Sequence, residues 1–372
     1  MSIVRDSLAV AVAARVPVLL WGGPGVGKTS AVRDMAAKAG LHCETVIASI
    51  REPSDFAGLP VVGTRNTGVT FAAPVWARRL AQEGTGILFL DEVSTAPPAV
   101  QAALLRVVLE RTVGDLDLPD DVTVVAAANP PEQAADGWDL AAPLANRFCH
   151  LEWDLGARDW ADGVIGGFDI PNIPKLEPSE LEAMSAAILT TVSAFVASRP
   201  ELLVAPPRDE ASAGRAWPSA RTWTMAARLI GAAQLHGADE SVQATLTAGC
   251  VGAPAAVEFG AWQSELELPD PEEALADPAS FELPERGDRA YAALSRIAAA
   301  VIANNTQERW EAAWLAIDTG IRNGKADIAI SIIRVLVRHR PDGAKPPRKV
   351  LGTVAPVLRE AGLFEVLMSP TG

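Results

Sequence analysis

The sequence predicts an α/β fold, with a parallel five-stranded sheet and flanking helices in the first 160 residues and mainly helical regions after residue 178. Four short runs are apolar throughout rather than alternating, which is typical of strands that are covered on both faces. Helical patterns separate these runs, and a fifth strand is expected between residues 148 and 155. The four runs cover residues 16–21, 45–50, 86–91 and 122–128.

The clearest helix of the first region follows the proline pair Pro97 and Pro98, because proline is favoured in the first turn of a helix. Its apolar side chains recur at helical spacing and should be buried together on one face. They are Val100, Leu104, Val107 and Val108. The opposite face carries Arg106 and Arg111.

Helical patterns dominate the second half of the chain. Ser179 and Glu182 have the spacing of a capping box, which predicts that an amphipathic helix begins there. A further helix is expected after the stretch "WPSARTW" at residues 217–223. The first of these helices should bury Met184, Ile188, Val192, Phe195 and Val196, and a later single helix should carry Val301, Ile302, Trp310 and Trp314.

Two segments of the second half carry charge of one sign. Residues 265–285 hold eight acidic residues, four prolines and no lysine or arginine, which indicates a solvated connector or a docking strip for a basic partner. Residues 334–349 reverse the sign, with six basic side chains against Asp342. A solvated helix end is the simpler explanation of this basic segment, and a phosphate-binding site is the alternative.

The overall composition is that of a folded protein, with 49% hydrophobic and 21% charged residues in a chain of 372. The net charge of −14 disfavours a nucleic acid as partner, because nonspecific affinity for its phosphates comes mainly from lysine and arginine. The first 20 residues lack a basic region and a cleavage signature, and no stretch of membrane-spanning length is free of polar interruption. We therefore expect a cytoplasmic protein without membrane contact.

The three cysteines, Cys43, Cys149 and Cys250, have no paired spacing typical of zinc or redox motifs. Buried free thiols are expected. His42 and His150 each neighbour a cysteine, but adjacent strand residues point to opposite faces and cannot readily share one metal ion.

A glycine-rich stretch, "GGPGVGKT" at residues 22–29, follows the first strand and opens a helix, as a phosphate-binding loop does. Glycines allow backbone N–H groups to curl around an anion. Lys28 should reach the outer phosphates, and Thr29 should offer its hydroxyl to Mg²⁺. The residues expected to bind the nucleotide are Gly23, Pro24, Gly25, Val26, Gly27, Lys28, Thr29 and Ser30.

Polar side chains follow two other strands of the predicted sheet. Asp91 and Glu92 end the run "ILFLDE", at the edge where open α/β sheets place their ligands. Asp91 should join Thr29 in holding Mg²⁺, and Glu92 should polarise the attacking water, although two such carboxylates could also form a solvated strand end. Asn129 ends the run "VTVVAAANP" and could hold the water or the γ-phosphate, or simply belong to a turn before Pro130.

Read together, "GGPGVGKT", "ILFLDE", "AAANP", "LANRF" and "PSARTW" resemble the AAA+ ATPases, specifically the MoxR-type branch with its dynein and midasin relatives. The resemblance covers about residues 1 to 240. It implies that Asn129 is sensor 1, Arg147 the arginine finger and Arg221 sensor 2. Residues 50–63 and 67–80 resemble the branch's helix 2 insert, and residues 111–122 its hairpin before sensor 1.

The resemblance implies three regions: an AAA+ nucleotide-binding domain at residues 1–160, a helical lid with sensor 2 at 175–260 and a helical C-terminal region at 285–372. It also implies ATP and Mg²⁺ as cofactors and a homo-oligomeric ring, expected to be a hexamer. Arg147 would reach the γ-phosphate held by the next protomer, whereas Arg221 would sense the phosphate of its own chain. A structural ion pair is the alternative for either arginine, and Arg106 and Arg111 are weaker candidates for contacts with the next protomer.

The function that this resemblance implies is an ATPase that remodels or activates a client protein, with a partner that carries a von Willebrand A domain. One alternative is a nucleic-acid motor of the restriction type, against which the acidic composition argues. A second alternative is a nucleotide-gated scaffold with little turnover. The presence of Glu92 and Arg147 argues against the scaffold.

Overall fold

The computed structural model describes residues 2–62, 68–130, 138–265, 268–364 and 367. Contacts divide the chain into two compact units. The first unit comprises Met1–Ser185 and Leu202–Glu258, and the second comprises Ala186–Glu201 and Phe259–Gly372. The division into regions at 1–160, 175–260 and 285–372 stays a prediction.

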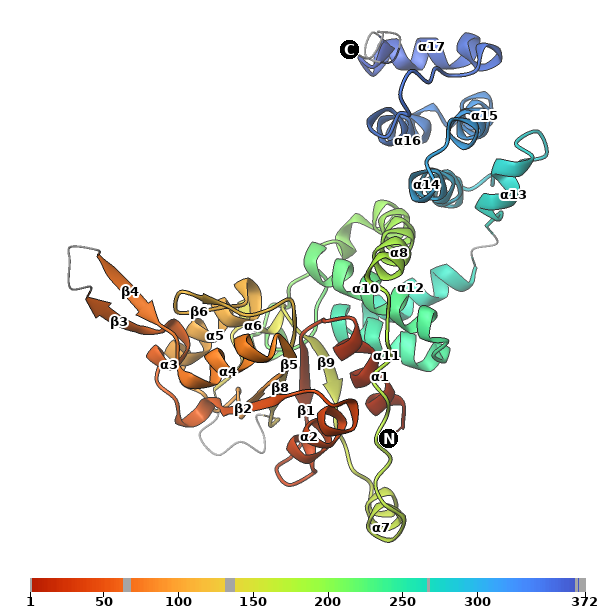
Figure 1. Ribbon diagram of the computed structural model, residues 1–372. Coiled ribbons are helices and arrows are strands. Elements are labelled where there is room, and N and C mark those ends of the chain that lie inside the picture. Colours follow the sequence, from red (N-terminus) through yellow and green to blue (C-terminus); the bar gives the residue numbers. More distant parts are fainter. Residues whose placement is uncertain (1, 63–67, 131–137, 266–267, 365–366, 368–372) are drawn as a thin grey trace. The chain divides into compact units, whose positions relative to one another are not determined.

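The first unit contains the predicted parallel sheet, with five strands in the order β2-β5-β8-β1-β9 (Figure 1). All of its strand pairs are parallel. The predicted second strand stops at Ile47, because Ala48–Ile50 turn into a 3-10 helix, η1. The strands are β1 Val18–Trp21, β2 Cys43–Ile47, β5 Thr85–Asp91, β8 Asp121–Ala128 and β9 Cys149–Glu152.

The apolar runs at residues 16–21, 86–91 and 122–128 are buried almost throughout, whereas the run at 45–50 is buried only at Val46 and Ala48, because β2 lies at an edge of the sheet. β5 and β8 lie in the middle of the sheet, and every residue of β5 from Gly86 to Leu90 is buried. One helix, α5 (Pro98–Glu110), packs the predicted face against the same core as Trp21 and Leu90. Burial of each large apolar side chain stabilises this layer by about 1.5–3 kcal/mol. The buried face of α5 consists of Val100, Gln101, Leu104, Val107 and Val108.

Further helices of the first unit surround the sheet and follow it in the chain (Figure 1). Those up to β9 are α1 Ser2–Ala13, α2 Lys28–Ala39, α3 Ser54–Ala57, α4 Val75–Glu83 and α6 Ala142–Ala145. Those after β9 are α7 Ala157–Gly166, α8 Pro178–Ser198, η3 Pro200–Leu202, α9 Glu210–Ala213, α10 Ala220–His236, α11 Glu240–Val251 and α12 Ala253–Ser264, of which α8, η3 and α12 continue into residues of the second unit.

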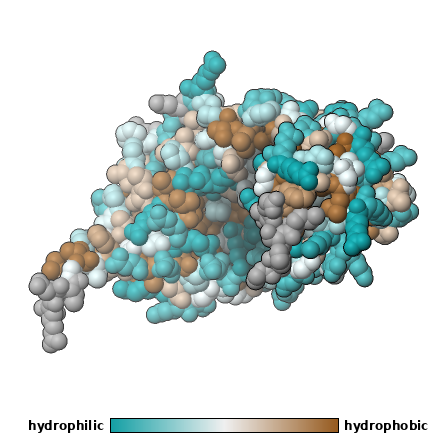
Figure 2. Space-filling view, turned by 90° about the horizontal axis from the view of Figure 1, so that it is seen from above, coloured by the Kyte–Doolittle hydropathy of each residue, from teal (hydrophilic) through white to brown (hydrophobic). Residues whose placement is uncertain are grey.

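Two short hairpins interrupt the α/β pattern, at the places where the resemblance implied an insert and a hairpin. One pairs β3 (Leu59–Val62) with β4 (Val69–Ala72), and the other pairs β6 (Thr112–Val113) with β7 (Leu116–Asp117). All residues of β3 and β4 are exposed, and Figure 2 shows apolar side chains beside the grey segment where this hairpin projects. The N–H of Phe71 donates a 2.7 Å hydrogen bond to the carboxylate of Asp115, which joins the two hairpins.

Helix α8 differs from its prediction at its start. It begins at Pro178, so Ser179 lies inside the first turn and is not the N-cap that the capping-box spacing implied. By length and composition alone the helix could cross a membrane, although Thr190, Thr191 and Ser193 interrupt its apolar sequence, as expected. Core helices of soluble proteins pass the same test, and α8 buries Leu181, Val192 and Phe195.

The second unit is helical, as predicted, but the single helix expected around Val301 and Trp314 is two helices. Val301 and Ile302 belong to α14, whereas Trp310 and Trp314 belong to α15. The hydroxyl of Thr306 accepts a 3.3 Å hydrogen bond from the N–H of Arg309, so a capped helix starts between the two pairs. The helices are α13 Pro271–Ala276, α14 Gly287–Ala303, α15 Gln307–Arg322, α16 Ala326–Arg338 and α17 Leu351–Glu360, with η4 Arg348–Val350.

The acidic segment of residues 265–285 is not merely a solvated connector. Within its described part, Leu275, Phe281 and Leu283 are buried in the core of the second unit. Glu272 accepts two hydrogen bonds from the guanidinium of Arg309, at 2.7 and 2.8 Å. The segment is therefore folded onto α14 and α15 through apolar contacts, and its proposed use as a docking strip stays a prediction.

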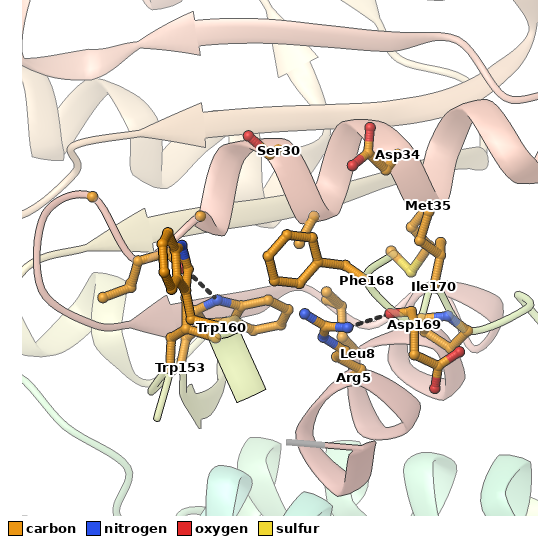
Figure 3. Close-up of a pocket in the computed structure, with 16 residues that line it drawn as sticks. Arg5, Leu8, Ser30, Asp34, Met35, Trp153, Trp160, Phe168, Asp169 and Ile170 are labelled. Carbon is orange, nitrogen blue, oxygen red and sulfur yellow. Dashed lines mark hydrogen bonds between the residues drawn. The ribbon is translucent and has the colours of Figure 1, made fainter. Parts of the chain in front are cut away.

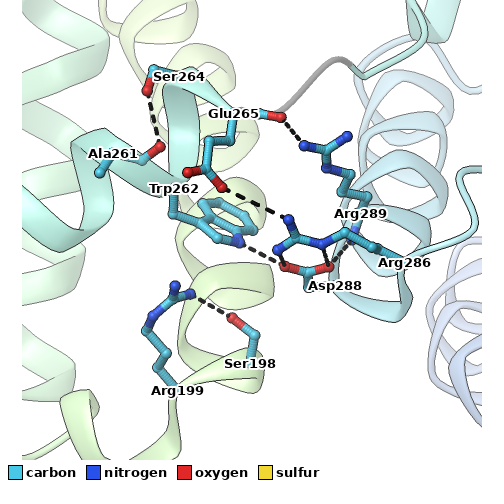
Figure 4. A network of polar contacts seen from close by, with 9 residues as sticks. All are labelled: Ser198, Arg199, Ala261, Trp262, Ser264, Glu265, Arg286, Asp288 and Arg289. Atoms are coloured by element: carbon cyan, nitrogen blue, oxygen red, sulfur yellow. Dashed lines mark hydrogen bonds and ion pairs between the residues drawn. The ribbon is translucent and has the colours of Figure 1, made fainter.

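A polar network joins the end of α12 to the start of α14 (Figure 4). The indole N–H of Trp262 donates a 2.9 Å hydrogen bond to Asp288, which also accepts one of 2.8 Å from Arg286. Arg286 reaches Glu265 as well, at 3.7 Å. The ion pairs are exposed and contribute little, so the buried Trp262 ring is the main anchor of this network. The basic segment of residues 334–349 keeps Arg334 and Arg338 exposed on α16, and its role stays a prediction.

Candidate functional site

The glycine-rich loop connects β1 to α2 at the carboxyl edge of the sheet. Gly25 and Gly27 adopt φ angles of 80° and 84°, a conformation that favours glycine. Gly22 is required for another reason: a Cβ atom there would lie 2.2 Å from the carbonyl oxygen of Trp153. The predicted loop residues Gly23 and Pro24 complete the curve, and Thr29 and Ser30 lie in the first turn of α2.

Lys28 is buried at the centre of this loop. Its Nζ donates hydrogen bonds to the carbonyl of Gly22 at 2.5 Å, to that of Gly23 at 2.9 Å and to Oδ1 of Asn129 at 3.0 Å. Burial lowers the pKa of Lys28, and the negative charges of Asp91 and Glu92 oppose this shift. The ammonium group is thus held between the loop and the end of β8, which is where a phosphate chain would need it.

Thr29 and Asp91 form the pair that could hold Mg²⁺. The hydroxyl of Thr29 donates a 2.8 Å hydrogen bond to Oδ2 of Asp91, which ends β5. Hard oxygen donors of this kind suit Mg²⁺, which usually takes one or two protein ligands and completes its shell with water and phosphate oxygens. The described residues contain no cluster of three or more histidine, cysteine or carboxylate groups that could hold a metal ion.

Glu92 has an unusual backbone and a partner that the sequence did not reveal. Its φ angle is 58°, which is strained for a residue other than glycine. The hydroxyl of Ser49 donates a short hydrogen bond to Oε2 of Glu92. Ser49 lies in η1, directly after β2, and the register pairs Ile47 of β2 with Asp91. The sequence contained one hint of the contact between Ser49 and Glu92, which was a hydroxyl residue near the end of a neighbouring strand.

Asn129 is fixed by a second residue that the sequence did not single out as a partner. The N–H of Asn129 donates a 3.1 Å hydrogen bond to Oγ of Ser94, and that hydroxyl donates one of 3.2 Å to the carbonyl of Asn129. Ser94 is buried. Because its side chain is bonded to Lys28, Asn129 lies beside the phosphate-binding loop, and its contact with the γ-phosphate or the attacking water stays a prediction.

A cavity of about 240 Å³ adjoins the loop (Figure 3). Residues 25–27 and Ser30 form one side of it, and aromatic side chains form much of the other. The guanidinium of Arg5 lies 5.9 Å from the ring centroid of Trp153 and 5.8 Å from that of Phe168. Flat aromatic walls beside a phosphate-binding loop suit a planar base. No motif in the sequence indicated this cavity, whose aromatic residues are Trp153, Trp160 and Phe168.

Arg147 and Arg221 are the two arginines that the resemblance assigns to the site. Arg147 follows α6 and donates a hydrogen bond to the carbonyl of Pro143, and Arg221 is exposed in the first turn of α10. Burial lowers the pKa of Arg147, and the positive charge of Arg221 lowers it further. Arg221 is thus near enough to act on Arg147 electrostatically, and the charges that act on Lys28 are those of Asp91 and Glu92.

Asn146 connects the arginine segment to α10. Its Nδ2 donates a 3.2 Å hydrogen bond to the carbonyl of Trp217, and its Oδ1 accepts one of 2.8 Å from the hydroxyl of Ser219. Ser219 is the N-cap of α10 and forms a capping box with Thr222. The helix that carries Arg221 thus starts against the segment that carries Arg147.

The two weaker arginine candidates have partners within the chain. Arg106 pairs with Glu110 at 3.0 Å on the exposed face of α5. Arg111 ends this helix with a φ angle of 57° and donates hydrogen bonds to the carbonyls of Pro119 and Val122. Arg111 therefore stabilises the turn before β8, and a contact of either arginine with another protomer stays a prediction.

These groups define a nucleotide-binding α/β domain with a phosphate-binding loop. Residues 17–150 match the family described as ATPase family associated with various cellular activities (AAA). Protein MoxR of Methylorubrum extorquens is 34% identical over 145 residues, which cover 38% of this chain and 41% of that protein. The transcriptional regulatory protein XylR of Pseudomonas putida is 32% identical over 130 residues, 33% of this chain and 23% of that protein.

By these matches residues 17–150 are similar to the ATPase domain of the AAA family, and MoxR is among the relatives of this segment. The matched segments span less than half the length of these curated relatives. A crystal structure of a protein from Cytophaga hutchinsonii aligns with a TM-score of 0.41 and 18% identity, over 66% of this chain and 79% of that one.

Proposed function

We propose that this protein hydrolyses ATP, and that the convergence of Lys28, Asp91 and Asn129 from three neighbouring strands carries this proposal. β1, β5 and β8 are parallel and adjacent, so their carboxyl ends bring these groups to one edge. Nucleotide binding follows from the family, and hydrolysis requires the additional groups at the same edge.

The chain's own residues would divide the work as follows. The loop amides and Lys28 bind the outer phosphates, and Asn129 orients the γ-phosphate or the attacking water. Glu92 orients and polarises that water once its carboxylate leaves the hydroxyl of Ser49. Thr29 and Asp91 would hold Mg²⁺, which when bound neutralises charge on the phosphates.

The pair of Arg147 and Arg221 supports a ring of identical subunits. Burial lowers the pKa of Arg147, and the positive charge of Arg221 lowers it further, so an anion near the two guanidinium groups would relieve their repulsion. Since Arg221 acts electrostatically on Arg147, which the resemblance directs to the next protomer, we propose that both read a phosphate held by the neighbouring protomer. This differs from the expectation that Arg221 senses the phosphate of its own chain. A closed head-to-tail ring, for which we propose six subunits, would complete each site in this way.

The ring would use ATP to remodel or activate a client protein in the cytoplasm, with a von Willebrand A domain protein as partner. This part of the proposal comes from the MoxR-type resemblance. The second unit offers the surface for such a partner, because its acidic segment keeps Glu273 and Glu282 exposed beside the folded part.

Calorimetry and a phosphate-release assay test the proposal together. Lys28→Ala should abolish ATP binding, and Glu92→Gln should bind ATP normally and hydrolyse it very slowly. Equal ATP affinity of Lys28→Ala and wild type would refute the loop assignment, and normal turnover of Glu92→Gln would refute the role of that carboxylate.

The ring is tested by mixing two inactive variants. In an equimolar mixture of Arg147→Ala and Lys28→Ala, about one interface in four combines an intact loop with an intact arginine, so partial turnover should return. Native mass measurement must show that mixed rings have formed. No recovery in mixed rings would contradict the action of Arg147 across the interface.

A further inference from the structure

His150 is a buried titratable residue that the proposed mechanism does not use. It lies on β9, between β1 and the packed helix α11, with 8% of its surface exposed. Both ring nitrogens are bonded. The indole N–H of Trp21 lies 2.8 Å from Nδ1, and the carbonyl of Ala145 lies 2.9 Å from Nε2.

These two contacts select one tautomer of His150. The indole of Trp21 can only donate, so Nδ1 must be the acceptor. The proton then lies on Nε2 and is donated to the carbonyl of Ala145. Burial lowers the pKa of His150 to about 4, so the ring is neutral near pH 7 and this arrangement is complete.

The two partners of His150 belong to the two halves of the proposed site. Trp21 ends β1 and directly precedes Gly22, where the phosphate-binding loop begins. Ala145 lies two residues before Arg147, in the four-residue helix α6. His150 is therefore a direct side-chain link between the loop strand and the arginine segment.

The arginine segment is held from two sides. His150 fixes the carbonyl of Ala145, and Ser219 fixes the side chain of Asn146 from the start of α10. The Trp21 ring is itself held, because the guanidinium of Arg215 lies 3.8 Å from its centroid and pairs with Glu152 at 2.9 Å. The backbone just before Arg147 thus has a fixed position relative to the loop.

We infer that His150 is a positioning residue for Arg147, and that Trp21 enforces the tautomer that holds the arginine segment in place. The inference rests on the proposed role of Arg147 in hydrolysis, and the mixed rings below also use its proposed action across the interface. A purely structural histidine would support both halves of the site equally. A positioning residue should instead affect what its chain lends to the neighbour and spare its own nucleotide site.

The decisive variant is His150→Phe, which keeps an aromatic ring in the core and removes both hydrogen bonds. It should bind ATP with the wild-type Kd, because no loop residue changes. Its turnover should fall by about 10- to 100-fold, the usual effect of misplacing a catalytic group by about 1 Å. His150→Gln should recover part of this loss, because its amide can still donate to the carbonyl of Ala145. Trp21→Phe, which frees the tautomer, should show a smaller loss of the same kind.

Mixed rings separate the two explanations. His150→Phe mixed with Lys28→Ala should regain turnover, since the first chain offers an intact loop and the second an intact arginine. His150→Phe mixed with Arg147→Ala should regain none, since neither chain offers a well-placed arginine. Recovery in this second mixture, or a weakened ATP affinity of His150→Phe alone, would overturn the inference.

The control mixture of Arg147→Ala and Lys28→Ala shows which proposal has failed. If the control mixture regains turnover, and the mixtures of His150→Phe with Lys28→Ala and with Arg147→Ala show the same turnover, only the positioning role is wrong. If the control does not recover, the interface proposal is wrong, and the inference then requires that His150→Phe still lose turnover at unchanged ATP affinity. Circular dichroism shows whether His150→Phe is folded; if it is not, the same mixtures with Trp21→Phe decide.

Discussion

The hydroxyl of Ser219 donates a 2.8 Å hydrogen bond to the side chain of Asn146, and both residues are buried. Ser219 caps the helix that carries Arg221, and Asn146 directly precedes Arg147. The bond therefore makes the position of one arginine depend on the position of the other. A movement of α10 would shift the arginine segment along with Arg221.

Asn146→Ala should lower the free energy of unfolding by about 1–3 kcal/mol, because the carbonyl of Trp217 and the hydroxyl of Ser219 lose their shared partner in a buried site. Urea denaturation measures this change. Thr224→Ala is the matched control, since it removes an exposed hydroxyl that bonds only within α10. Equal losses of unfolding free energy in the two variants would show that the buried hydrogen bonds of Asn146 contribute no more to stability than an exposed hydroxyl does.

Ser49→Ala should raise the basal rate of ATP hydrolysis, because the hydroxyl holds Glu92 by its carboxylate. A hydrogen bond to a charged group is strong enough for an increase of about three- to tenfold. Phosphate release at saturating ATP measures the rate. Ser49→Thr keeps the hydroxyl and should behave as wild type; an unchanged or lower rate in Ser49→Ala would contradict the restraint.

Gly22→Ala should destabilise the first unit by about 1–3 kcal/mol or more, the usual range for overpacking. The added Cβ would lie 2.2 Å from the carbonyl oxygen of Trp153, and a backbone group cannot turn aside as a flexible side chain can. Thermal or urea unfolding checks this. Gly166→Ala is the control, because nothing lies within 4 Å of a Cβ there and its φ angle is not positive. Similar losses of stability in both variants would show that the backbone shifts and relieves the contact between the added Cβ and the carbonyl oxygen of Trp153.

The buried His150 predicts a loss of stability in acid. Its folded pKa of about 4 lies below its ordinary value of 6.5, so its contribution is complete above the unfolded pKa and is lost as the pH falls towards 4. Between about pH 8 and about pH 5 the loss should be about 2 kcal/mol. Urea denaturation of wild type and His150→Phe tests this, since the variant should lack that part of the slope. Parallel pH profiles would contradict the buried, neutral state.

The sheet and the phosphate-binding loop were predictable because their signals are local. Continuous apolar runs indicate buried parallel strands, and the glycines mark the curve around Lys28. The link from Ser49 to Glu92 and the cavity beside Trp160 depend on which segments the fold brings together, so no spacing along the chain reveals them. The extra helix start at Thr306 was missed because apolar residues continue on both sides of a short interruption.

Arg221 shows that the sequence also left contacts within the candidate site unpredicted. Its motif "PSARTW" was recognisable, and the N-cap at Ser219 could be inferred from serine before a helix. The hydrogen bond between Ser219 and Asn146 depends on the path of the chain through α7 and α8. Local sequence patterns do not determine that path. The residue type was therefore predictable, whereas its partner was not.

Arg221 provides the sharpest prediction about the ring, because we propose that it acts together with Arg147 across the interface. If Arg221 acts on the next protomer's nucleotide, Arg221→Ala mixed with Lys28→Ala should regain turnover, since the first chain offers the loop and the second offers both arginines. If Arg221 acts on its own nucleotide, that mixture contains no complete site and stays inactive. Phosphate release by the mixed rings gives the answer.

In a second mixture the two models predict the opposite results. It therefore also shows whether subunits exchange. Arg221→Ala mixed with Arg147→Ala should stay inactive if both arginines act across the interface, because no chain then lends both. The same mixture should regain turnover if only Arg147 acts across it, since the Arg147→Ala chain would supply its own Arg221 and take Arg147 from its neighbour. About one interface in four is of the productive kind in either mixture. Because the two models predict opposite results in the two mixtures, activity in the second and silence in the first would place Arg221 on its own nucleotide and contradict its joint action with Arg147 on the neighbouring protomer.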